Sequence, residues 1–497
     1  MAKSGAGYQK LADAEPRDDQ QLPQVLFVQD RRRDRARRFL RFALFVVVPV
    51  LVFFSLFGKT VPGFGPGCHS SPPLSSVIDG LSSHPSESCG TDFHNIHDGS
   101  YPLQFGAERQ VHFIQQLGTS RGRGRGRVPV NVSGYVRVVA AATSDAKGKI
   151  DLQIDANEDN LPVHTFWDPE SQRLRVRIDD VYRRDDGARP CVDVRAVVHV
   201  PADADLQTLK VEVTTLDISI EDKLGLAADE TILTSVASDI TFGRDSLRSG
   251  ARLALTSVSG RIRADAPLLA RVESFTTSGS NHVDVYPPAA WRDFDTAFLN
   301  VHSVSGDITV HDPIDHPEDL PAADYVRKAS TVSGTVSASL LFSSKAEFAG
   351  QPSGDLEIKL RPVLAGKLAD ADGEVTSRLT TDTVSGDAQI RILEPTWIGK
   401  QDGSWALYSS HKSVSGDVDV RLPDAWEGKF ASRSLTGKIE VRGKDVHLGT
   451  NAEETEAAKG DVEGAMFKSV SGRKGEGNSK LEVRTTTGDI KLVVGEE

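Results

Sequence analysis

From Val128 onward, apolar and polar residues alternate with a period of two. Successive side chains of a β-strand point to opposite faces, so each alternating run predicts a strand with one buried face. Turn-forming clusters such as Asp185-Asp186-Gly187 separate the runs. None of the runs has the 3.6-residue period of an amphipathic helix. We therefore expect an all-β body. The clearest runs are YVRVV at 135–139, KIDLQI at 149–154, RLRVRI at 173–178 and VDVRAVVHV at 192–200.

A short motif recurs within this alternation. Its fullest form, Ser/Thr-Val-Ser-Gly-Asp-x-x-Val/Ile, begins at Ser303, Thr383 and Ser413, and looser copies fill the intervals. The glycine is expected in a turn or bulge that needs a positive φ, and the following Asp is expected to cap that turn. Repeats of this size indicate stacked units. The motif glycines to which we assign a turn are Gly260, Gly306, Gly334, Gly386, Gly416, Gly437, Gly472 and Gly488.

Two all-β architectures fit these repeats. A β-solenoid, in which short strands stack coil upon coil, is favoured because the same small Ser or Thr returns in each unit and can form ladders. A β-sandwich of hairpins with Ser-Gly or Gly-Asp turns is the alternative.

The N-terminal region has a different pattern. Residues 42–57 contain no charged side chain, and residues 39 and 40 extend the apolar segment toward the arginine-rich run Arg31–Arg38. Cytoplasmic flanks carry the excess of Lys and Arg, so we predict a single-pass signal anchor with a cytosolic N-terminus and a luminal or extracellular C-terminus. A cleaved signal peptide and a buried core helix are the alternatives.

These patterns divide the chain into five regions. We expect a disordered cytosolic tail, a transmembrane anchor, a stalk rich in Pro, Ser and Gly that ends in a basic Gly-Arg loop, an N-terminal β region and the β-repeat domain. The net charge is −12, although residues 1–60 have five more basic than acidic side chains. The acidic body argues against nucleic acid as a partner. In that order the regions are 1–38, 39–57, 58–127, 128–191 and 192–497.

From about Val192 to Val494 the repeats resemble the putative adhesin domain family, which is similar to the head GIN domain. The resemblance rests on the repeated Ser/Thr-x-Ser-Gly-Asp elements and on the opening sequence VHVPADADLQTLKVEVTTLDISI. It implies a β-helix-like fold and a surface or envelope setting. The family supplies no catalytic residues.

The sequence gives no basis for assigning enzymatic chemistry. We find no P-loop or zinc-protease motif, and we predict no catalytic residue, cofactor or metal site. His94 with His97, and the group His311, Asp312, Asp315 and His316, have ligand-type side chains, but we interpret them as polar residues of solvated loops rather than as metal ligands.

Other candidate residues concern processing and binding. Asn131 begins a glycosylation sequon, and Cys68 and Cys89 could form a disulfide within the stalk. Four tryptophans are expected in loops between repeats, where they either contact a ligand or cover the edge of the core. They are Trp291, Trp397, Trp405 and Trp426.

The expected function is therefore interaction rather than catalysis. The β-repeat domain would present an elongated face to a protein or polysaccharide. A structural spacer without a specific ligand and a carbohydrate-active enzyme of the β-helix type are the alternatives.

Overall fold

The computed structural model describes most of the chain after residue 88. The expected anchor at 39–57 and the expected tail lie outside the described residues, and no helix within the described part is long and apolar enough to cross a membrane. The described residues all belong to one compact unit, Ser82–Glu497. They are Cys89, 92–118, 127–142, 147–179, 181–183, 190–287, 294–312, 316, 320–371, 373–399, 403–449 and 468–495.

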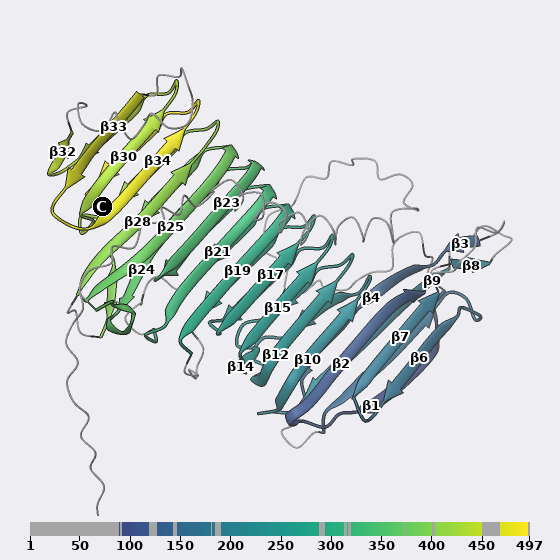
Figure 1. The fold of residues 1–497 in the computed structure, drawn as a ribbon. Coiled ribbons are helices and arrows are strands. Elements are labelled where there is room, and N and C mark those ends of the chain that lie inside the picture. Colours follow the sequence, from purple (N-terminus) through teal and green to yellow (C-terminus); the bar gives the residue numbers. More distant parts are fainter. Residues whose placement is uncertain are drawn as a thin grey trace, which may run out of the picture. The chain divides into compact units, whose positions relative to one another are not determined.

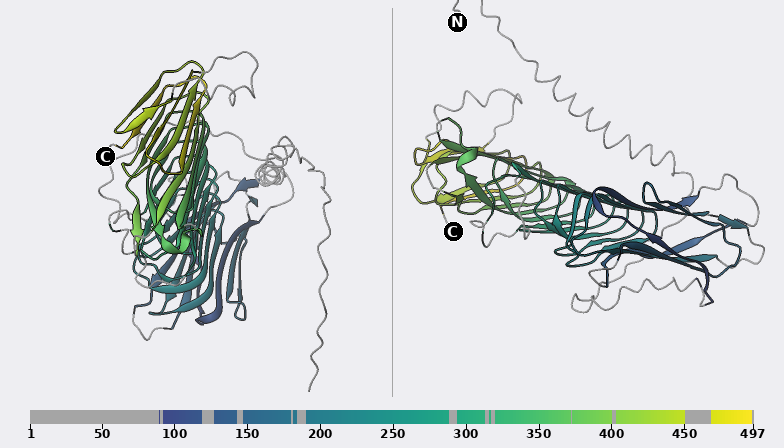
Figure 2. Two further views of the ribbon diagram at one scale, coloured as in Figure 1. Left: turned by 60° about the vertical axis from the view of Figure 1, so that its left-hand side comes forward. Right: turned by 90° about the horizontal axis from the view of Figure 1, so that it is seen from below.

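The prediction of an all-β body is confirmed, because the strands form two large sheets that face each other across one core (Figure 1; Figure 2). Within the described residues the only helical element longer than a single residue is the short 3₁₀ turn η4 (Gly366–Leu368). We call the two sheets A and B.

In spatial order, sheet A contains β1 (His94–Pro102), β5 (Lys149–Ala156), β9 (Cys191–Val200), β4 (Asn131–Ala140), β11 (Asp217–Ile220), β13 (Ile240–Phe242), β16 (Ile262–Pro267), β18 (Asn281–Tyr286), β20 (Ile308–His311), β22 (Val336–Phe342), β24 (Leu356–Ala365), β26 (Ala388–Ile392), β29 (Val418–Leu422), β35 (Ile490–Val494) and β31 (Ile439–Gly443), with β27 (Thr396–Ile398) beside β24.

Sheet B contains β6 (Val163–Asp168), β7 (Arg173–Asp179), β2 (Gly106–Gly118), β10 (Asp205–Val213), β12 (Leu226–Ser235), β15 (Arg252–Ser257), β17 (Arg271–Thr276), β19 (Thr296–Ser305), β21 (Asp324–Ser333), β23 (Lys345–Ser353), β25 (Glu374–Ser385), β28 (Ser404–Lys412), β34 (Ser479–Thr485), β30 (Gly428–Ser434), β33 (Lys468–Lys474) and β32 (Val446–Leu448), with β14 (Leu247–Ser249) beside β12. A separate pair joins β3 (Arg127–Pro129) and β8 (Val181–Arg183).

From β10 to β31 the chain alternates between the sheets. A strand of sheet B leads through a turn into a strand of sheet A, and we call such a pair a coil. From β15 on these turns contain the Ser/Thr-Gly motif, whereas the turns after β10 and β12 have no glycine. Successive coils pair in parallel, for example β15 with β17 and β16 with β18. The solenoid prediction requires this pairing, whereas the hairpins of a sandwich would be antiparallel. Antiparallel pairs join strands near the two ends of the sheets, as in β5 with β9 and β30 with β33.

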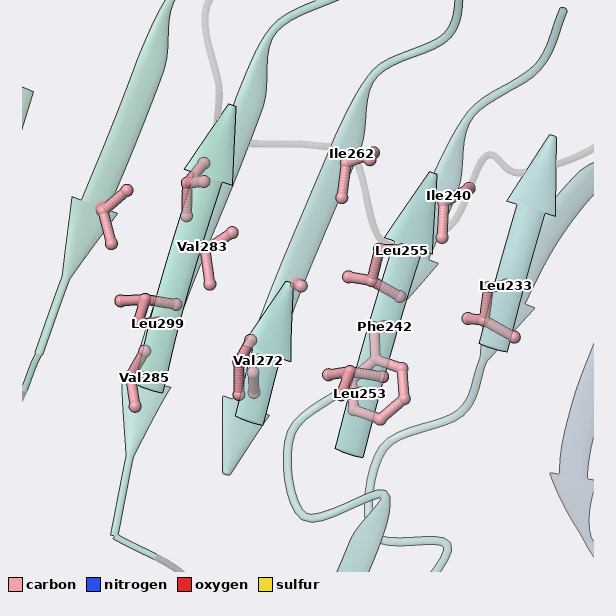
Figure 3. Packing of buried hydrophobic residues seen from close by; sticks show 14 of the residues in the cluster. Leu233, Ile240, Phe242, Leu253, Leu255, Ile262, Val272, Val283, Val285 and Leu299 are labelled. Atoms are coloured by element: carbon pink, nitrogen blue, oxygen red, sulfur yellow. The ribbon is translucent and has the colours of Figure 1, made fainter. Parts of the chain in front are cut away.

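The inner residues of both sheets form a continuous core. Ile262 and Val283 of sheet A face Leu255, Val272 and Leu299 of sheet B, as the close view shows (Figure 3). In-register pairing aligns equivalent apolar positions of neighbouring coils, such as Leu253 with Val272. The alternation seen in the sequence therefore places one apolar row above the next.

The last coil in the sequence lies between two earlier ones. β34 pairs in parallel with both β28 and β30, and β35 pairs with both β29 and β31. The coil of β30 and β31 therefore lies beyond the last coil, and the hairpin of β32 and β33 continues sheet B from there.

This arrangement explains a wrong assignment. Gly472 is not in a turn, because its copy of the motif is an extended part of β33. There a Cβ would lie 2.4 Å from the Phe430 ring, so glycine allows close antiparallel packing on β30.

Two expected boundaries also differ. β1 and β2 lie within the region expected to be a stalk, and β4 pairs with β9 across the expected boundary at residue 191. The residues from Leu103 to Val494 share one core, so the two expected β regions are one.

The disulfide links Cys89 to Cys191, not to Cys68. Their Cα atoms lie 5.7 Å apart, because Cys191 begins β9 next to the segment that holds Cys89. Cys68 lies outside the described residues. A contact across 102 positions could not be read from cysteine spacing.

The motif glycines stack on one another at the corner between the sheets. A Cβ on Gly306 would lie 2.4 Å from the carbonyl oxygen of Gly279, and one on Gly416 would lie 2.1 Å from that of Gly386. These two glycines also have positive φ values of 157° and 148°. Gly260 and Gly437 meet the same kind of contact without a positive φ. Close approach of the backbone, more than φ, is thus what every corner requires.

Side chains beside the glycines tie neighbouring coils together. We expected the Asp after the glycine to cap its own turn. Instead, its carboxylate accepts a hydrogen bond from a backbone amide of the next coil. Asp387 accepts from Asp417 N at 2.9 Å, and Asp417 accepts from Asp489 N at 2.8 Å. Inside the corner, the buried hydroxyl of Thr331 donates to Gly306 O at 3.2 Å. The expected Ser/Thr ladder therefore exists.

We expect Gly416→Ala to lower the free energy of unfolding by about 2–5 kcal/mol, because the methyl group adds backbone strain and a clash with the preceding coil. Chemical denaturation of both proteins measures the difference. Gly366→Ala is the control, since no heavy atom lies within 4 Å of the added Cβ. Equal stability of the Gly416→Ala variant and the wild type would contradict the stacking argument.

One ion pair is buried in the core. Arg327 of β21 points inward, and its Nε donates to Asp312 Oδ2 at 2.9 Å, with both side chains at most 1% exposed. Arg327 Nη1 also donates to Ala297 O at 2.7 Å. Burial raises the pKa of the Asp312 carboxyl, and the neighbouring guanidinium opposes that shift. Asp312 is thus a structural partner of Arg327.

Removing one member of this pair leaves a buried charge alone. Asp312→Ala should destabilise the protein by about 3–5 kcal/mol, whereas the double variant Asp312→Leu with Arg327→Met should lie within about 1 kcal/mol of the wild type. Urea denaturation tests both. If Asp312→Ala is as stable as the double variant, Asp312 does not compensate the buried charge of Arg327.

Candidate functional site

The outer face of sheet B has three rows of side chains that run across the strands. In β15 these outward residues are Arg252, Ala254 and Thr256, and parallel pairing aligns each with its equivalent in the next coil. We call them the first, middle and third rows. Neighbouring strands lie ~4.8 Å apart, so side chains of one row contact those of the next coil.

In the earlier coils the cations of these rows are paired. Glu273 of the middle row binds Arg252 at 3.0 Å and Arg271 at 2.6 Å. Glu347, also in the middle row, binds Lys328 at 2.7 Å and Lys345 at 2.6 Å. The hydrogen bond from Arg271 is the main influence that holds the pKa of Glu273 below its usual value. In this part of the face, each of these four cations therefore has a carboxylate partner.

The middle row changes at β25. Thr380 aligns with Glu347, and Ser410, Glu482 and Ala431 follow it on β28, β34 and β30. Three of these four side chains are small. The middle row therefore becomes a floor that lies lower than the rows on either side.

Long side chains form the two walls. The first row contains Arg378, Tyr408, Lys480 and Lys429, which with the floor line a hollow of about 570 Å³. Lys480 Nζ lies 5.7 Å from the centre of the Tyr408 ring. The third row follows two residues further along the strands, on the other side of the floor and outside the lining of this hollow, and supplies Lys412, Arg484 and Arg433. We call the floor and both walls the basic groove.

Several cations of the basic groove lack the carboxylate partners that the cations of the earlier coils have. Within the described residues, Arg378, Lys429 and Arg433 form no ion pair. Glu482 is the only carboxylate on the floor, and Arg484 binds it. Asp382, at the β25 end of the third row, has its pKa raised by burial, an effect that Lys412 opposes. The groove therefore has the residues to bind an anionic group.

The structure separates the four tryptophans. Trp426 is completely buried, so the prediction that it contacts a ligand is wrong and the alternative, covering the core, holds. Trp405 and Trp397 lie in strands rather than in loops, and Trp405 Nε1 donates to Ser377 Oγ at 3.2 Å. Both are partly buried. Trp291 lies outside the described residues.

The histidine groups are not brought together as metal ligands. His94 pairs with Asp159 at 2.7 Å, and His97 Nε2 lies 3.0 Å from the Tyr101 hydroxyl. Asp312 is held by Arg327, while Asp315 lies outside the described residues. In the part of the chain that the structure describes, no three His, Cys, Asp or Glu side chains are placed to hold a metal.

Asn131 begins β4, and its amide donates to Cys89 Sγ at 3.1 Å. The side chain therefore lies at the disulfide. Glycosylation at this position stays a prediction.

Sequence reasoning missed the basic groove. Outward cations occur in most coils, so Arg378 and Lys429 do not stand out along the chain. What distinguishes this region is its middle row, where Thr380 of β25 aligns with Glu347 of β23. That alignment is known only once the strand register is known.

Comparisons with known proteins add little. No protein-family model matches the chain, and no curated protein is similar enough to count as a match. One solved structure, described as a putative cell adhesion protein from Clostridium sporogenes, is 6% identical, covers 80% of this chain and 99% of its own, and has a TM-score of 0.12. A likeness this weak supports no conclusion about fold or function, and the resemblance to the adhesin family remains one of sequence motifs.

A buried histidine lies directly beneath the groove. His411 points inward from β28, between the outward Ser410 and Lys412, and its Nδ1 is hydrogen-bonded to the Thr381 hydroxyl at 2.9 Å. Burial lowers the pKa of His411 to about 3. Because the unfolded chain binds this proton near pH 6.5 and the folded chain does not, its contribution to stability is present above that pH and is lost as the pH falls.

We expect the free energy of unfolding to fall by about 2–3 kcal/mol between pH 6.5 and 4.5 because of His411. His411→Asn keeps an acceptor for Thr381 but does not titrate, so the wild type and the variant should differ in slope over this range. Denaturant titrations at several pH values measure both slopes. Parallel slopes would show that His411 is not protonated on unfolding.

Proposed function

We propose that this chain is a membrane-anchored interaction protein whose β-solenoid presents the basic groove to a ligand on the non-cytosolic side. The anchor and its direction rest on sequence alone, on the arginines at 31–38 and the uncharged segment at 42–57. The binding role rests on the described structure.

The observation that carries the proposal is the contrast between coils of one sheet. Up to β23, the middle-row glutamates neutralise the cations beside them. From β25 on, small residues take those positions and the cations face solvent over a hollow. The six cations of the groove outnumber its two carboxylates, Glu482 and Asp382, so their exposure fits a ligand of opposite charge.

Binding is favoured over catalysis by the composition of the groove. Glycoside hydrolysis generally uses two carboxyl groups that flank the scissile bond. On the floor, Glu482 is the only carboxylate and Arg484 binds it, while Asp382 lies in the third row two strands away from Glu482. A carbohydrate-active enzyme is the alternative. It would shorten a bound polymer, so the chain length of the polymer after incubation with the protein tests this alternative.

The test compares two matched variants. Ala431 lies on the groove floor, and Ala254 holds the same middle-row position in an earlier coil. In proteoliposomes carrying the full-length chain, Ala431→Glu should reduce retention on immobilised extracellular material from the native cell type at least tenfold, because the new carboxylate neutralises the walls. Ala254→Glu should leave retention unchanged.

Two outcomes would overturn the proposal. If Ala254→Glu weakens retention as much as Ala431→Glu does, the ligand does not bind in the basic groove. No retention of the wild type would favour a spacer without a specific ligand. Circular dichroism of each variant checks that the sheets are intact.

A further inference from the structure

We infer that the ligand of the basic groove is a linear anionic polysaccharide that lies across the strands, with its carboxylate or sulfate groups between the two walls. This inference rests on the proposed function and adds the chemical class of the ligand and its direction. Three features of the groove lead to it.

The first feature is charge on both sides of one floor. Arg378, Lys480 and Lys429 stand on one side, and Lys412, Arg484 and Arg433 on the other. Guanidinium and ammonium groups donate to carboxylate and sulfate oxygens, and Arg does so in a planar fork. A ligand on the floor would meet cations from both sides.

The second feature is regular spacing. The four strands that line the hollow cover ~14 Å at ~4.8 Å per strand, and the floor continues to Ser471 of β33. Cations recur along this line with each strand. An extended polymer with repeating charges matches the ladder better than a compact anion, since it can place an anionic group near each successive strand. A pyranose unit advances by a length similar to one strand spacing.

The third feature favours a sugar backbone over other polyanions. The partly exposed Tyr408 ring in the first wall offers an apolar face on which a sugar ring can stack. Thr380, Ser410 and Ser471 supply hydroxyl groups along the floor. A polyglutamate chain would use the cations but has no ring for Tyr408. Single-stranded DNA has rings, but one tyrosine in four strands is not the series of aromatic platforms that its bases use.

The experiment measures binding of the full-length chain in detergent to defined polymers. The probes are polygalacturonate, dextran sulfate, neutral dextran, polyglutamate and oligo-dT, each at 50 and 300 mM NaCl. We expect polygalacturonate or dextran sulfate to bind, to weaken at least fivefold at the higher salt, and to bind at least tenfold more tightly than dextran, polyglutamate or oligo-dT. Comparison of the two preferred probes separates a carboxylate ligand from a sulfate ligand.

Variants locate the polymer. Ser410→Glu should weaken the preferred polysaccharide at least tenfold, and Ala254→Glu should not change its binding. Tyr408→Ala should weaken the polysaccharide at least threefold and leave residual polyglutamate binding unchanged. Tetragalacturonate should compete far better than the dimer, because only the longer chain reaches several strands.

The results distinguish the ligand class from the binding role. Equal affinity for polyglutamate or oligo-dT, or no effect of Tyr408→Ala, would overturn the polysaccharide assignment. If no polysaccharide binds but proteoliposomes are still retained in a manner sensitive to Ala431→Glu, the inference fails and the proposed function stands. If no polysaccharide binds and the proteoliposomes are not retained, both the inference and the proposed function are refuted.

Discussion

The close approach of backbones at the Ser/Thr-Gly corner is the constraint on which the other features depend. Each motif glycine at a corner packs its Cα against a backbone carbonyl of the neighbouring coil, and any side chain there would overlap that backbone. Because the corners nest in this way, successive coils keep the same register on both sheets. The corner therefore fixes the spacing of every ladder in the molecule.

Three ladders depend on that register. The aspartates after the glycines bind the next coil's amide, the buried hydroxyls bind the preceding turn, and the apolar residues between the sheets align row upon row. On the outer face the same register determines which charges meet. It brings Arg252 of one coil to Glu273 of the next, and it aligns Thr380 with Glu347 where the basic groove begins. Structure and surface chemistry thus share one repeat.

The inserted last coil determines the composition of the basic groove. Lys480 and Glu482 lie between Tyr408 and Lys429 only because β34 enters between β28 and β30. Without that insertion the chain order would place β30 directly beside β28. The return of the chain also leaves β33 free to pair in the antiparallel direction, which accounts for the extended form of the motif at Gly472. The topology of the C-terminal part thus assembles the site.

By itself, the sequence determined the local features of this protein. Period-two alternation gave the strands of 135–139 and 173–178, and recurrent glycines marked the corners, because these properties depend on neighbours within a few residues. Only the tertiary structure decided which strands lie side by side. It chose Cys191 as the partner of Cys89, buried Trp426, and brought Arg378, Lys429 and Lys480 to one groove. Contacts between distant coils depend on register and on chain order in space, and one sequence without its fold specifies neither.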